Sequence, residues 1–408
     1  MNILEKRKST RNRRTSLTCR TFETKVDRSK LSATLKKQLN TLFHEAKWFY
    51  NYCLSNIKES NYRIKVVPVK TPDGIEERNF QYLSSQMKQS IRTRLFDNLK
   101  SLKKLKEKGF KIGGLKYKKF VKSIPLVQLN FTFYIKDNQI RIQGFKSWIR
   151  IQGLDQLPKD CEISNATLVK SGNDFYFNIT TYSEREERNT DGSIGIDFGC
   201  ETQLTFDNEI KIQYEVPVSK RLKRLDRKIS KNRNRKNSKK KLQRKNKRIK
   251  EYRKVTNKKR DIQHKIVNAI TSVYKHVCFQ NESIHAWHAG NHGKKIQKTG
   301  IGTILSALKS KAEVPIIVDK FFPSTQLCPI CGKKNKLELK DRTYICECGY
   351  TEDRDVKSSI CIKEEAMKQI PPDQREFKTG ETLSTTFFDI LNNIQNIKVS
   401  KSKIKSVN

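Results

Sequence analysis

The sequence predicts a multidomain chain that combines an α+β part with an α/β part. Three observations predict this fold class. The length of 408 residues suits two or three domains. Two stretches with helical spacing precede a series of short alternating strands. Beyond residue 190, strands alternate with helices, which is typical of an α/β domain.

The N-terminal half begins with a basic stretch and a helical segment. Residues 1–16 are basic and rich in Ser and Thr, and we expect them to form a flexible arm. Apolar residues recur every three or four positions over 31–57 and 87–105, which predicts two helices. Residues 58–78 contain two prolines and a glycine, which predict a loop.

Short strands follow the helical segment. Apolar and polar residues alternate from Val127 to Ile135, which predicts a strand with one buried face. Asp137-Asn138 and Gly172-Asn173-Asp174 are turn sequences between further strands that run to residue 181. Short strands at this spacing predict a small sandwich or barrel.

The C-terminal half alternates strands and helices. Ser193 to Asp197 is an apolar strand that ends in an acid, and residues 202–206 are its expected hairpin partner. A long basic helix or helix pair is expected over 219–261, and short strands at 277–279 and 315–318. The tail from Pro371 has no pattern that predicts a structure.

The charge of the chain indicates a polyanionic partner. The 86 Lys and Arg residues outnumber 42 Asp and Glu residues, which gives a formal net charge of +44. Such a charge attracts nucleic acids or anionic surfaces. No run of about 18 apolar residues is present, and no apolar stretch follows the basic start. We therefore expect no membrane partner, no secretory signal and a cytoplasmic location.

Much of this charge lies in one segment. Residues 220–260 hold 23 Lys and Arg residues, opposed by Asp226 and Glu251. An uncompensated run of this size repels itself, so a polyphosphate is its natural counter-charge, although shorter runs are usually just solvated helix faces. The candidate nucleic-acid-binding residues are Arg221, Arg224, Arg233, Arg235, Lys239, Lys240, Lys241, Arg244, Lys247 and Arg248.

Four cysteines have the spacing of a zinc site. Cys328 and Cys331 form one close pair, and Cys346 and Cys348 form another after fourteen residues. Four thiolates in two pairs match a tetrahedral zinc site, and a site filled by cysteine has no open position for substrate. A structural zinc ion is therefore expected.

Acidic residues follow or end predicted strands. Asp197 ends an apolar strand, Glu282 follows another, and Asp353 and Asp355 come just after the cysteines. Carboxylate oxygens hold Mg²⁺, and two such ions can activate water for phosphodiester hydrolysis. Each acid alone is also typical of a loop cap. The sequence around Asp197 is similar to the phosphate loop of actin-like kinases as well, but the Gly and Thr of their phosphate turn do not follow it.

Taken in order, these motifs resemble one family, the TnpB-type RNA-guided endonucleases of transposons and the compact type V CRISPR effectors. The first RuvC motif is matched by Gly195-Ile196-Asp197-Phe198-Gly199, the second by Glu282, and the third by Asp353-Arg354-Asp355-Val356. The run from Phe322 to Gly332 resembles the entry into the zinc ribbon of the family. Weaker similarity lies at residues 48–51 and 114–118, so the resemblance spans roughly 17–362.

The resemblance implies a domain order. A helical recognition domain at 31–119 would be inserted in a β-barrel wedge domain formed by 17–30 and 120–190. An RNase H-like RuvC nuclease domain would comprise 191–323 and 352–370. The zinc ribbon at 324–351 would be inserted in it, and 371–408 would be a C-terminal tail.

The resemblance also implies an activity, its site and its partners. The chain would bind a guide RNA and cleave target DNA beside a short flanking motif. Asp197, Glu282 and Asp355 would be the catalytic residues and would hold Mg²⁺, with two ions expected and Mn²⁺ as a substitute; Zn²⁺ would be structural. The second Asp of the third motif is the ligand in the family, which selects Asp355 over Asp353. The resemblance leaves open whether the chain forms a homodimer.

The sequence departs from the family at three points. Lys357-Ser358-Ser359 replaces Asn-Ala-Ala, Ser283 replaces an acid, and the second cysteine pair is C-x-C. Three alternatives stay open: an RNA-guided DNA-binding repressor without cleavage, a basic zinc-ribbon RNA-binding protein, and a DNA transposase. The three acids in the expected order argue against the first two, and the lack of a separate site-specific DNA-binding motif argues against the third.

Overall fold

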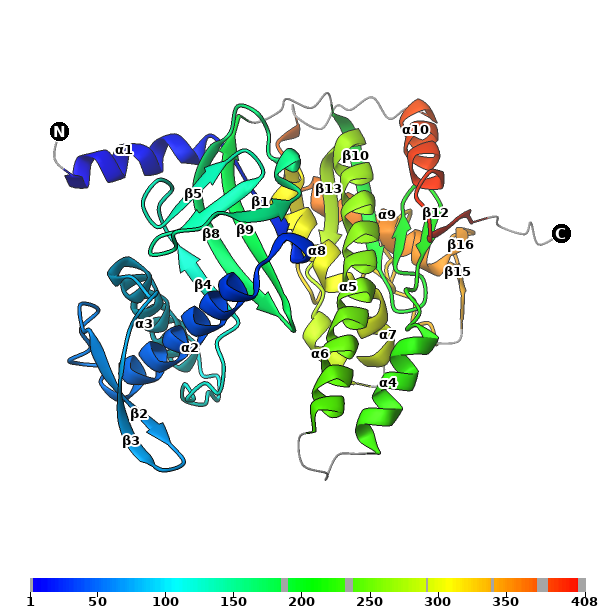
Figure 1. The fold of residues 1–408 in the computed structure, drawn as a ribbon. Coiled ribbons are helices and arrows are strands. Elements are labelled where there is room, and N and C mark those ends of the chain that lie inside the picture. The colour runs from blue at the N-terminus through cyan, green and yellow to red at the C-terminus, as the bar shows by residue number, and fades with distance from the viewer. Residues whose placement is uncertain are drawn as a thin grey trace. The chain divides into compact units, whose positions relative to one another are not determined.

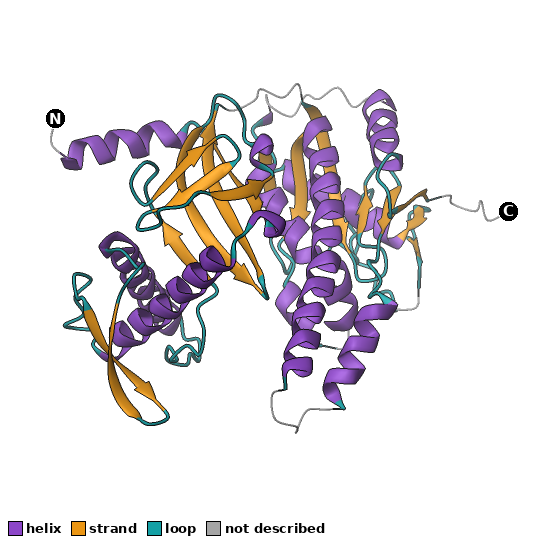
Figure 2. Cartoon of the chain, viewed as in Figure 1, coloured by secondary structure: helices purple, strands orange, loops and turns teal. Residues whose placement is uncertain are grey.

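The computed structural model describes residues 3–184, 190–231, 238–290, 293–338, 341–372 and 381–402. The chain divides into two compact units, Met1–Glu186 and Glu187–Asn408. Both units mix helices and strands (Figures 1 and 2). The predicted combination of an α+β part and an α/β part is thus present. No described helix is long and apolar enough to cross a membrane.

The first unit contains a seven-stranded antiparallel sheet and three long helices. Its helices are α1 (Ile3–Thr15), α2 (Ala33–Ser55) and α3 (Ser85–Glu107), with short 3-10 turns at Arg28–Lys30 and Leu154–Gln156. Its strands are β1 (Thr18–Val26), β2 (Val66–Thr71), β3 (Gly74–Asn79), β4 (Ser123–Leu126), β5 (Phe133–Lys136), β6 (Gln139–Ile142), β7 (Ile149–Gln152), β8 (Glu162–Ser171) and β9 (Asp174–Ser183).

The sheet of this unit has the order β4-β8-β9-β1-β7-β6-β5, and its neighbours pair antiparallel. Among the described residues, its two end strands β4 and β5 do not pair with each other. The sheet is therefore an open form of the predicted barrel. The long pairings of β1 with β9 and of β9 with β8 form its centre.

One hydrophobic core joins this sheet to α2 and α3. Leu39, Phe49 and Met87 come from the helices, and Phe133 and Phe177 come from the strands; all five are fully buried. Ser32 and Ser84 cap the two helices, each by accepting a hydrogen bond from the backbone N–H three residues later. The boundary that we expect between a helical domain and a wedge domain therefore runs through a shared core.

Three expectations for this unit differ from the structure. Residues Ile3–Thr15 form helix α1 rather than a flexible arm. The expected loop at 58–78 contains most of the hairpin β2–β3, whose two-residue turn is Pro72-Asp73. The expected strand from Val127 begins only at Phe133, because residues 128–132 form a turn in which Thr132 N–H donates to the Gln128 carbonyl.

The second unit is built around a six-stranded mixed sheet. Its strands are β10 (Asp191–Phe198), β11 (Leu204–Phe206), β12 (Ile210–Gln213), β13 (Tyr274–Gln280), β14 (Val314–Val318) and β17 (Lys398–Lys401), and a small hairpin comprises β15 (Thr343–Ile345) and β16 (Thr351–Asp353). Its helices are α4 (Lys220–Ser230), α5 (Lys239–Val273), α6 (Ile284–Ala289), α7 (Gly293–Thr299), α8 (Ile301–Lys311), α9 (Arg354–Met367) and α10 (Glu381–Asn392).

The order of this sheet is β14-β13-β10-β11-β12-β17. Strands β10, β13 and β14 run parallel, whereas β11, β12 and β17 are antiparallel to their neighbours. One core contains Ile194 and Ile196 of β10 together with Ile266 and Ile270 of α5. The long α5 thus packs by its C-terminal part on the sheet, as Figure 1 shows.

The tail without a predicted structure completes this sheet. Strand β17 pairs antiparallel with β12. Helix α10 places Phe387 edge-on against Phe206 and Tyr274, at ring-centroid distances of 5.1 and 5.3 Å. Three residues of this tail, Phe387, Leu391 and Ile394, therefore belong to the core of the second unit.

Candidate active site and metal centre

Asp197 lies near the C-terminal end of β10, in the middle of the six-stranded sheet. Its strand is hydrogen-bonded on one side to the parallel β13 and on the other to β11. Loss of hydration raises the pKa of Asp197 well above its usual range, and the negative charges of Asp355 and Glu282 raise it further. Glu282 and Asp355 therefore lie close enough to Asp197 to act on it electrostatically.

Glu282 reaches the same sheet edge because it follows the neighbouring parallel strand. Strand β13 ends at Gln280, and the Glu282 N–H donates to the Gln280 carbonyl at 2.9 Å. Residue Ile196 of β10 is paired with Phe279 of β13, so the two strands end at the same level. Partial burial raises the pKa of Glu282. The acids after parallel strands thus meet at the carboxyl edge of the sheet, a common place for sites in α/β domains.

Asp355 stands in the first turn of α9, and the neighbouring Asp353 is the cap of that helix. One carboxylate oxygen of Asp353 accepts hydrogen bonds from the N–H groups of Asp355 and Val356, at 3.0 and 3.2 Å. Its other oxygen pairs with Lys211 Nζ at 2.7 Å. Both oxygens of Asp353 are thus engaged in holding the helix. This geometry favours Asp355 as the third ligand, in line with our assignment, which stays a prediction.

The start of α9 is held against β10 by a close approach at Gly195. A Cβ atom at Gly195 would lie 2.3 Å from the backbone oxygen of Ser359, so a larger residue would push the helix away. Ser358 and Ser359 are fully buried, and their small side chains allow this contact. Asp207 reinforces it by accepting from the Gly195 N–H at 2.8 Å and pairing with Lys363 at 2.6 Å.

The three carboxylates are better suited to bind a divalent cation than to transfer a proton through a single acid. The charges of Asp355 and Glu282 disfavour ionisation of the desolvated Asp197 carboxyl unless a cation neutralises the group. Arg354 and Lys357 are the nearby cations that lower the pKa of Asp197, but these effects are smaller than those of burial and the two acids. In the described part of the chain, the three acids do not form a group whose ligand atoms all lie within 4.8 Å of one another.

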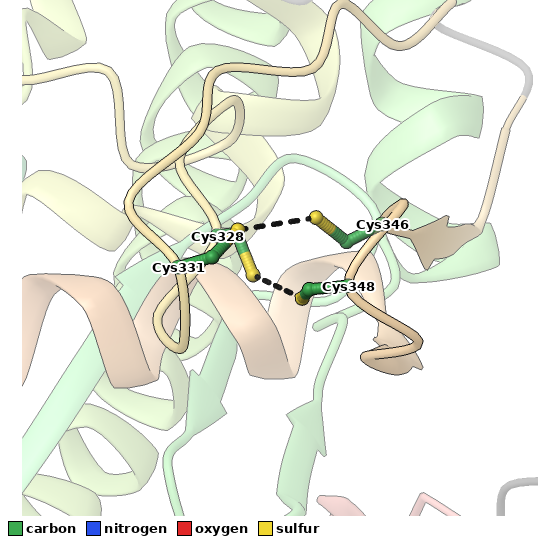
Figure 3. A group of neighbouring side chains, drawn as sticks. All are labelled: Cys328, Cys331, Cys346 and Cys348. Atoms are coloured by element: carbon green, nitrogen blue, oxygen red, sulfur yellow. Dashed lines mark hydrogen bonds between the residues drawn. The ribbon is translucent and has the colours of Figure 1, made fainter.

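The four cysteines predicted as zinc ligands do lie together. Their Sγ atoms all lie within 4.8 Å of one another, and Figure 3 shows them directed toward a common centre. The sulfur atoms of Cys328 and Cys348 are 3.6 Å apart, and those of Cys331 and Cys346 are 3.5 Å apart. A tetrahedron with Zn–S bonds of about 2.3 Å has edges of about 3.8 Å. The geometry of the thiols therefore fits a structural zinc ion.

Each cysteine pair lies on a tight backbone turn, here called a knuckle, that holds the thiols in place. The Gly332 N–H donates to the Cys328 carbonyl at 3.0 Å, and the Gly349 N–H donates to the Cys346 carbonyl at 3.0 Å. Both glycines have a positive φ, 69° and 87°, which the turns require. The backbone N–H of Cys348, together with hydrogen bonds from the neighbouring thiols, lowers the pKa of the Cys346 thiol to about 6, while hydrogen bonds with the same group of thiols raise the pKa of Cys348. One thiolate is thus favoured within the cluster, and thiolates are the form that binds metal.

A buried lysine connects this metal centre to α9. Lys357 is fully buried, and its Nζ donates hydrogen bonds to the carbonyls of Ser324 at 2.8 Å and Leu327 at 3.0 Å. The ammonium lies 4.2 Å from the centre of the Tyr344 ring. Burial lowers the pKa of Lys357 to about 8. Lys357, which replaces the Asn of the family's third motif, is thus hydrogen-bonded to the backbone that leads into the first cysteine pair.

The basic segment forms the predicted helix pair, α4 and α5. Of the ten candidate nucleic-acid-binding residues, Arg233 and Arg235 lie outside the described residues. Arg221 pairs with Glu251 at 3.6 Å, Arg248 pairs with Asp226, and Lys241 is buried. Four others are exposed: Arg224, Lys239, Lys240 and Lys247; Arg244 is half-buried. Part of the predicted surface thus also holds the two helices together.

Comparisons with known proteins agree with the sequence motifs. Residues 302–362 match the family described as Cas12f1-like, TNB domain. A curated protein from Streptomyces pristinaespiralis, named as an RNA-guided DNA endonuclease, is 26% identical over 179 residues. The resemblance to TnpB-type and compact type V effectors is confirmed.

The extent of this likeness is partial. The matched region covers 42% of this chain and 44% of the curated relative, so the chain spans less than half the length of that relative. The solved cryo-EM structure of a Cas12f1–sgRNA–target DNA complex aligns over 81% of this chain and 83% of that chain. Its TM-score is 0.45 at 14% sequence identity, a likeness too low to establish a common fold.

Several residues at the site were not singled out from the sequence. Lys211 pairs with the helix cap Asp353, and Asp207 pairs with Lys363. An acid and a lysine far apart in a basic chain carry no local signal. The apolar strand predicted at Ser193 to Asp197 is present as part of β10, and its residues from Gly192 to Ile196 are buried.

Proposed function

We propose that this protein is an RNA-guided DNA endonuclease of the RuvC type. The observation that carries the proposal is the placement of Asp197 near the end of β10 and of Glu282 just after β13, the parallel neighbour of β10. The charges of Glu282 and of Asp355 on α9 both act on Asp197. The family match at residues 302–362 and the endonuclease name of the curated relative support the same conclusion.

In this proposal each acid has a distinct role. Asp197, whose pKa responds to both other acids, would be shared by two Mg²⁺ ions, and Glu282 and Asp355 would each complete the ligands of one. When bound, these ions would supply an activated water and charge stabilisation at the leaving 3′-oxygen. The protein contributes rigidity, since the close contact of Gly195 with Ser359 fixes α9 and therefore Asp355. Mn²⁺ is expected to substitute.

The other parts of the chain would bind and position the nucleic acids. The exposed cations of α4 and α5 would contact phosphates, while base pairing between a guide RNA and one DNA strand would supply sequence specificity. The four cysteines would hold a structural zinc ion. We assign the sheet of the first unit to a wedge function and α2 and α3 to recognition of the duplex beside a short flanking motif.

A plasmid-cleavage assay tests the proposal. The protein is co-expressed with its native flanking RNA and offered a matched target in Mg²⁺, as wild type and as Asp197→Ala, Glu282→Ala or Asp355→Ala. Each substitution should abolish cleavage, and the three losses should not add, because the acids act as a unit. Binding of RNA and target should persist, since affinity comes from the basic surfaces and base pairing.

A non-cleaving RNA-guided repressor is the second candidate. It is favoured by the wider spacing of the three carboxylates compared with the cysteine cluster, within the part of the chain that the structure describes. A wild-type protein that binds a matched target but never cuts it in Mg²⁺ would establish this alternative and refute the nuclease.

A further inference from the structure

A basic cavity lies in the first unit, whereas the acids and cysteines belong to the second unit. Its volume is about 280 Å³. It is lined by residues of α2, α3 and the segment that leads into β4, among them Tyr50, Arg94, Lys118, Phe120 and Lys122. None of the residues that line it is acidic. The cavity therefore has a positive wall that nothing in its own lining neutralises.

The cations of this cavity lie close enough to repel one another. Arg94 is half-buried and donates from Nη1 to the Ser123 hydroxyl at 3.0 Å. Partial burial lowers the pKa of Lys118, and repulsion by Arg94 lowers it further. Within the described ranges, Arg94, Lys118 and Lys122 form no ion pair with an acid. Bringing like charges together costs free energy that a bound anion would offset.

The cavity is also held in shape by its surroundings. The side-chain amide of Asn51 donates to the Lys118 carbonyl at 3.1 Å and accepts from the Lys118 N–H at 2.9 Å. The Lys118 ammonium lies 3.8 Å from the centre of the Tyr50 ring, which packs in the core. The Asn51 clamp fixes the backbone and the Tyr50 ring supports the ammonium, so little ordering is left for ligand binding.

An aromatic ring stands at the edge of the cavity. Phe120 is 66% exposed, and Lys122 Nζ lies 5.9 Å from its ring centre. An exposed aromatic face beside cations is the arrangement on which nucleic-acid bases stack while their phosphates are neutralised. A small inorganic anion would use the cations but would not need the ring.

We propose that this cavity binds a phosphodiester group of a nucleic-acid strand, with Arg94, Lys118 and Lys122 at the phosphate and Phe120 stacked on an adjacent base. The inference rests on the proposed function for the kind of partner, and it adds a site that is separate from the acids and from α4 and α5. RNA and DNA share the phosphodiester chemistry, and the experiment distinguishes them.

The test measures binding of fluorescein-labelled dT12 and U12 to the full-length protein over a range of salt concentrations, without added Mg²⁺. The variant Arg94→Gln/Lys118→Gln should bind more weakly, and its slope of log K against log salt should shrink by about 0.7, because the single-stranded probe loses one phosphate contact. The control Lys103→Gln/Lys106→Gln also removes two positive charges, from exposed positions on α3, the helix that carries Arg94. It should change the slope less.

Two further measurements guard against misfolding of the variant. Phe120→Ala changes an exposed ring and should weaken oligonucleotide binding by at least about fivefold with no change in melting temperature. Acetylation of the wild-type protein followed by mass spectrometry should show Lys118 protected by the oligonucleotide and Lys103 unprotected. Protection by U12 alone assigns the cavity to RNA, by dT12 alone to DNA, and by both to either strand.

The proposal is overturned if Arg94→Gln/Lys118→Gln matches its control and Lys118 reacts equally with and without oligonucleotide. A failure of the nuclease proposal would look different. In that case the wild-type plasmid assay would show no cleavage, while the protection of Lys118 and the loss of affinity in the variants would persist.

Discussion

The ammonium of Lys357 donates a hydrogen bond to the carbonyl of Leu327, one residue before Cys328, the first cysteine of the cluster. Lys357 lies two residues after Asp355 on α9, and Cys361, one turn further, directs its thiol to the same carbonyl at 3.4 Å. The knuckle of the cysteine cluster and the helix that carries the third acid are therefore joined through one carbonyl group. Movement of the knuckle would be transmitted to the helix.

We predict that Lys357→Met destabilises the protein by about 1–3 kcal/mol, because the Ser324 carbonyl loses the donor that the structure shows for it. The melting temperature should fall, and zinc should be lost to a chelator sooner. Lys368→Met is the control, since Lys368 is 71% exposed and pairs with Glu365 at the end of the same helix. Equal behaviour of the two variants would show that Lys357 does not couple the knuckle to α9.

The zinc site gives a second prediction. Purified protein should contain about one zinc ion per chain, and Cys328→Ser or Cys346→Ser should lose it and loosen residues 324–352, because such sites contribute folding free energy directly. Elemental analysis and hydrogen exchange measure the two effects. Cys19→Ser, an exposed thiol outside the cluster, should change neither. Well-folded protein without zinc would contradict the prediction.

Asp353 and Asp355 should respond differently to substitution. Asp353→Ala removes a helix cap and the partner of Lys211, so it should cost about 0.5–2 kcal/mol of stability and leave part of the cleavage activity. Asp355→Ala should abolish cleavage with a smaller effect on the melting temperature. Cleavage rates and thermal melts of both variants make the comparison. An inactive Asp353→Ala beside an active Asp355→Ala would reverse our ligand assignment.

The helix pair α4 and α5 gives a prediction about salt. Substituting the exposed Arg224, Lys239, Lys240 and Lys247 by Gln should weaken nucleic-acid binding. The slope of log K against log salt should fall by about 0.7–0.9 for each phosphate that is no longer neutralised. The comparison variant Arg221→Gln/Arg248→Gln breaks the ion pairs with Glu251 and Asp226, so it should mainly lower the stability of the pair. An unchanged slope in the first variant would mean that these exposed cations of α4 and α5 are only solvated and do not contact phosphates.

Local patterns in the sequence were enough to predict the cysteine cluster and most of the secondary structure. The cysteine spacing acts over a short stretch, and Asp197 and Glu282 lie at or just after strands that apolar runs predict. Long-range pairings were beyond such patterns. The tail was not predicted to join the sheet because β17 is short and polar, and its place depends on the free edge of β12.

The helix α1 shows the same limit at the other end of the chain. Its composition, with little apolar surface, predicts a flexible arm, yet Arg13 and Arg14 each reach one carboxylate oxygen of Glu162 on β8, at 2.7 and 2.6 Å. Arg14 also lies 4.6 Å from the Tyr182 ring centre. The residue that holds the helix is thus about 150 positions away, where sequence periodicity gives no indication of it.

This contact should depend on pH. The hydrogen bond from Arg14 is the largest of the effects that lower the pKa of Glu162. Because the folded pKa lies below the unfolded value of about 4.3, the stabilisation is fully present above that value and is lost as the pH falls through the lowered pKa. The pair is partly exposed, so we expect no more than about 1 kcal/mol. Amide exchange of residues 10–15, compared between wild type and Glu162→Gln at equal pH, should show faster exchange in the variant at pH 7. The difference should disappear once the pH lies below the lowered pKa, where the wild-type carboxyl is also neutral. A difference that stays constant over an acid titration to complete protonation would mean that Glu162 holds α1 by packing or neutral hydrogen bonds instead of charge.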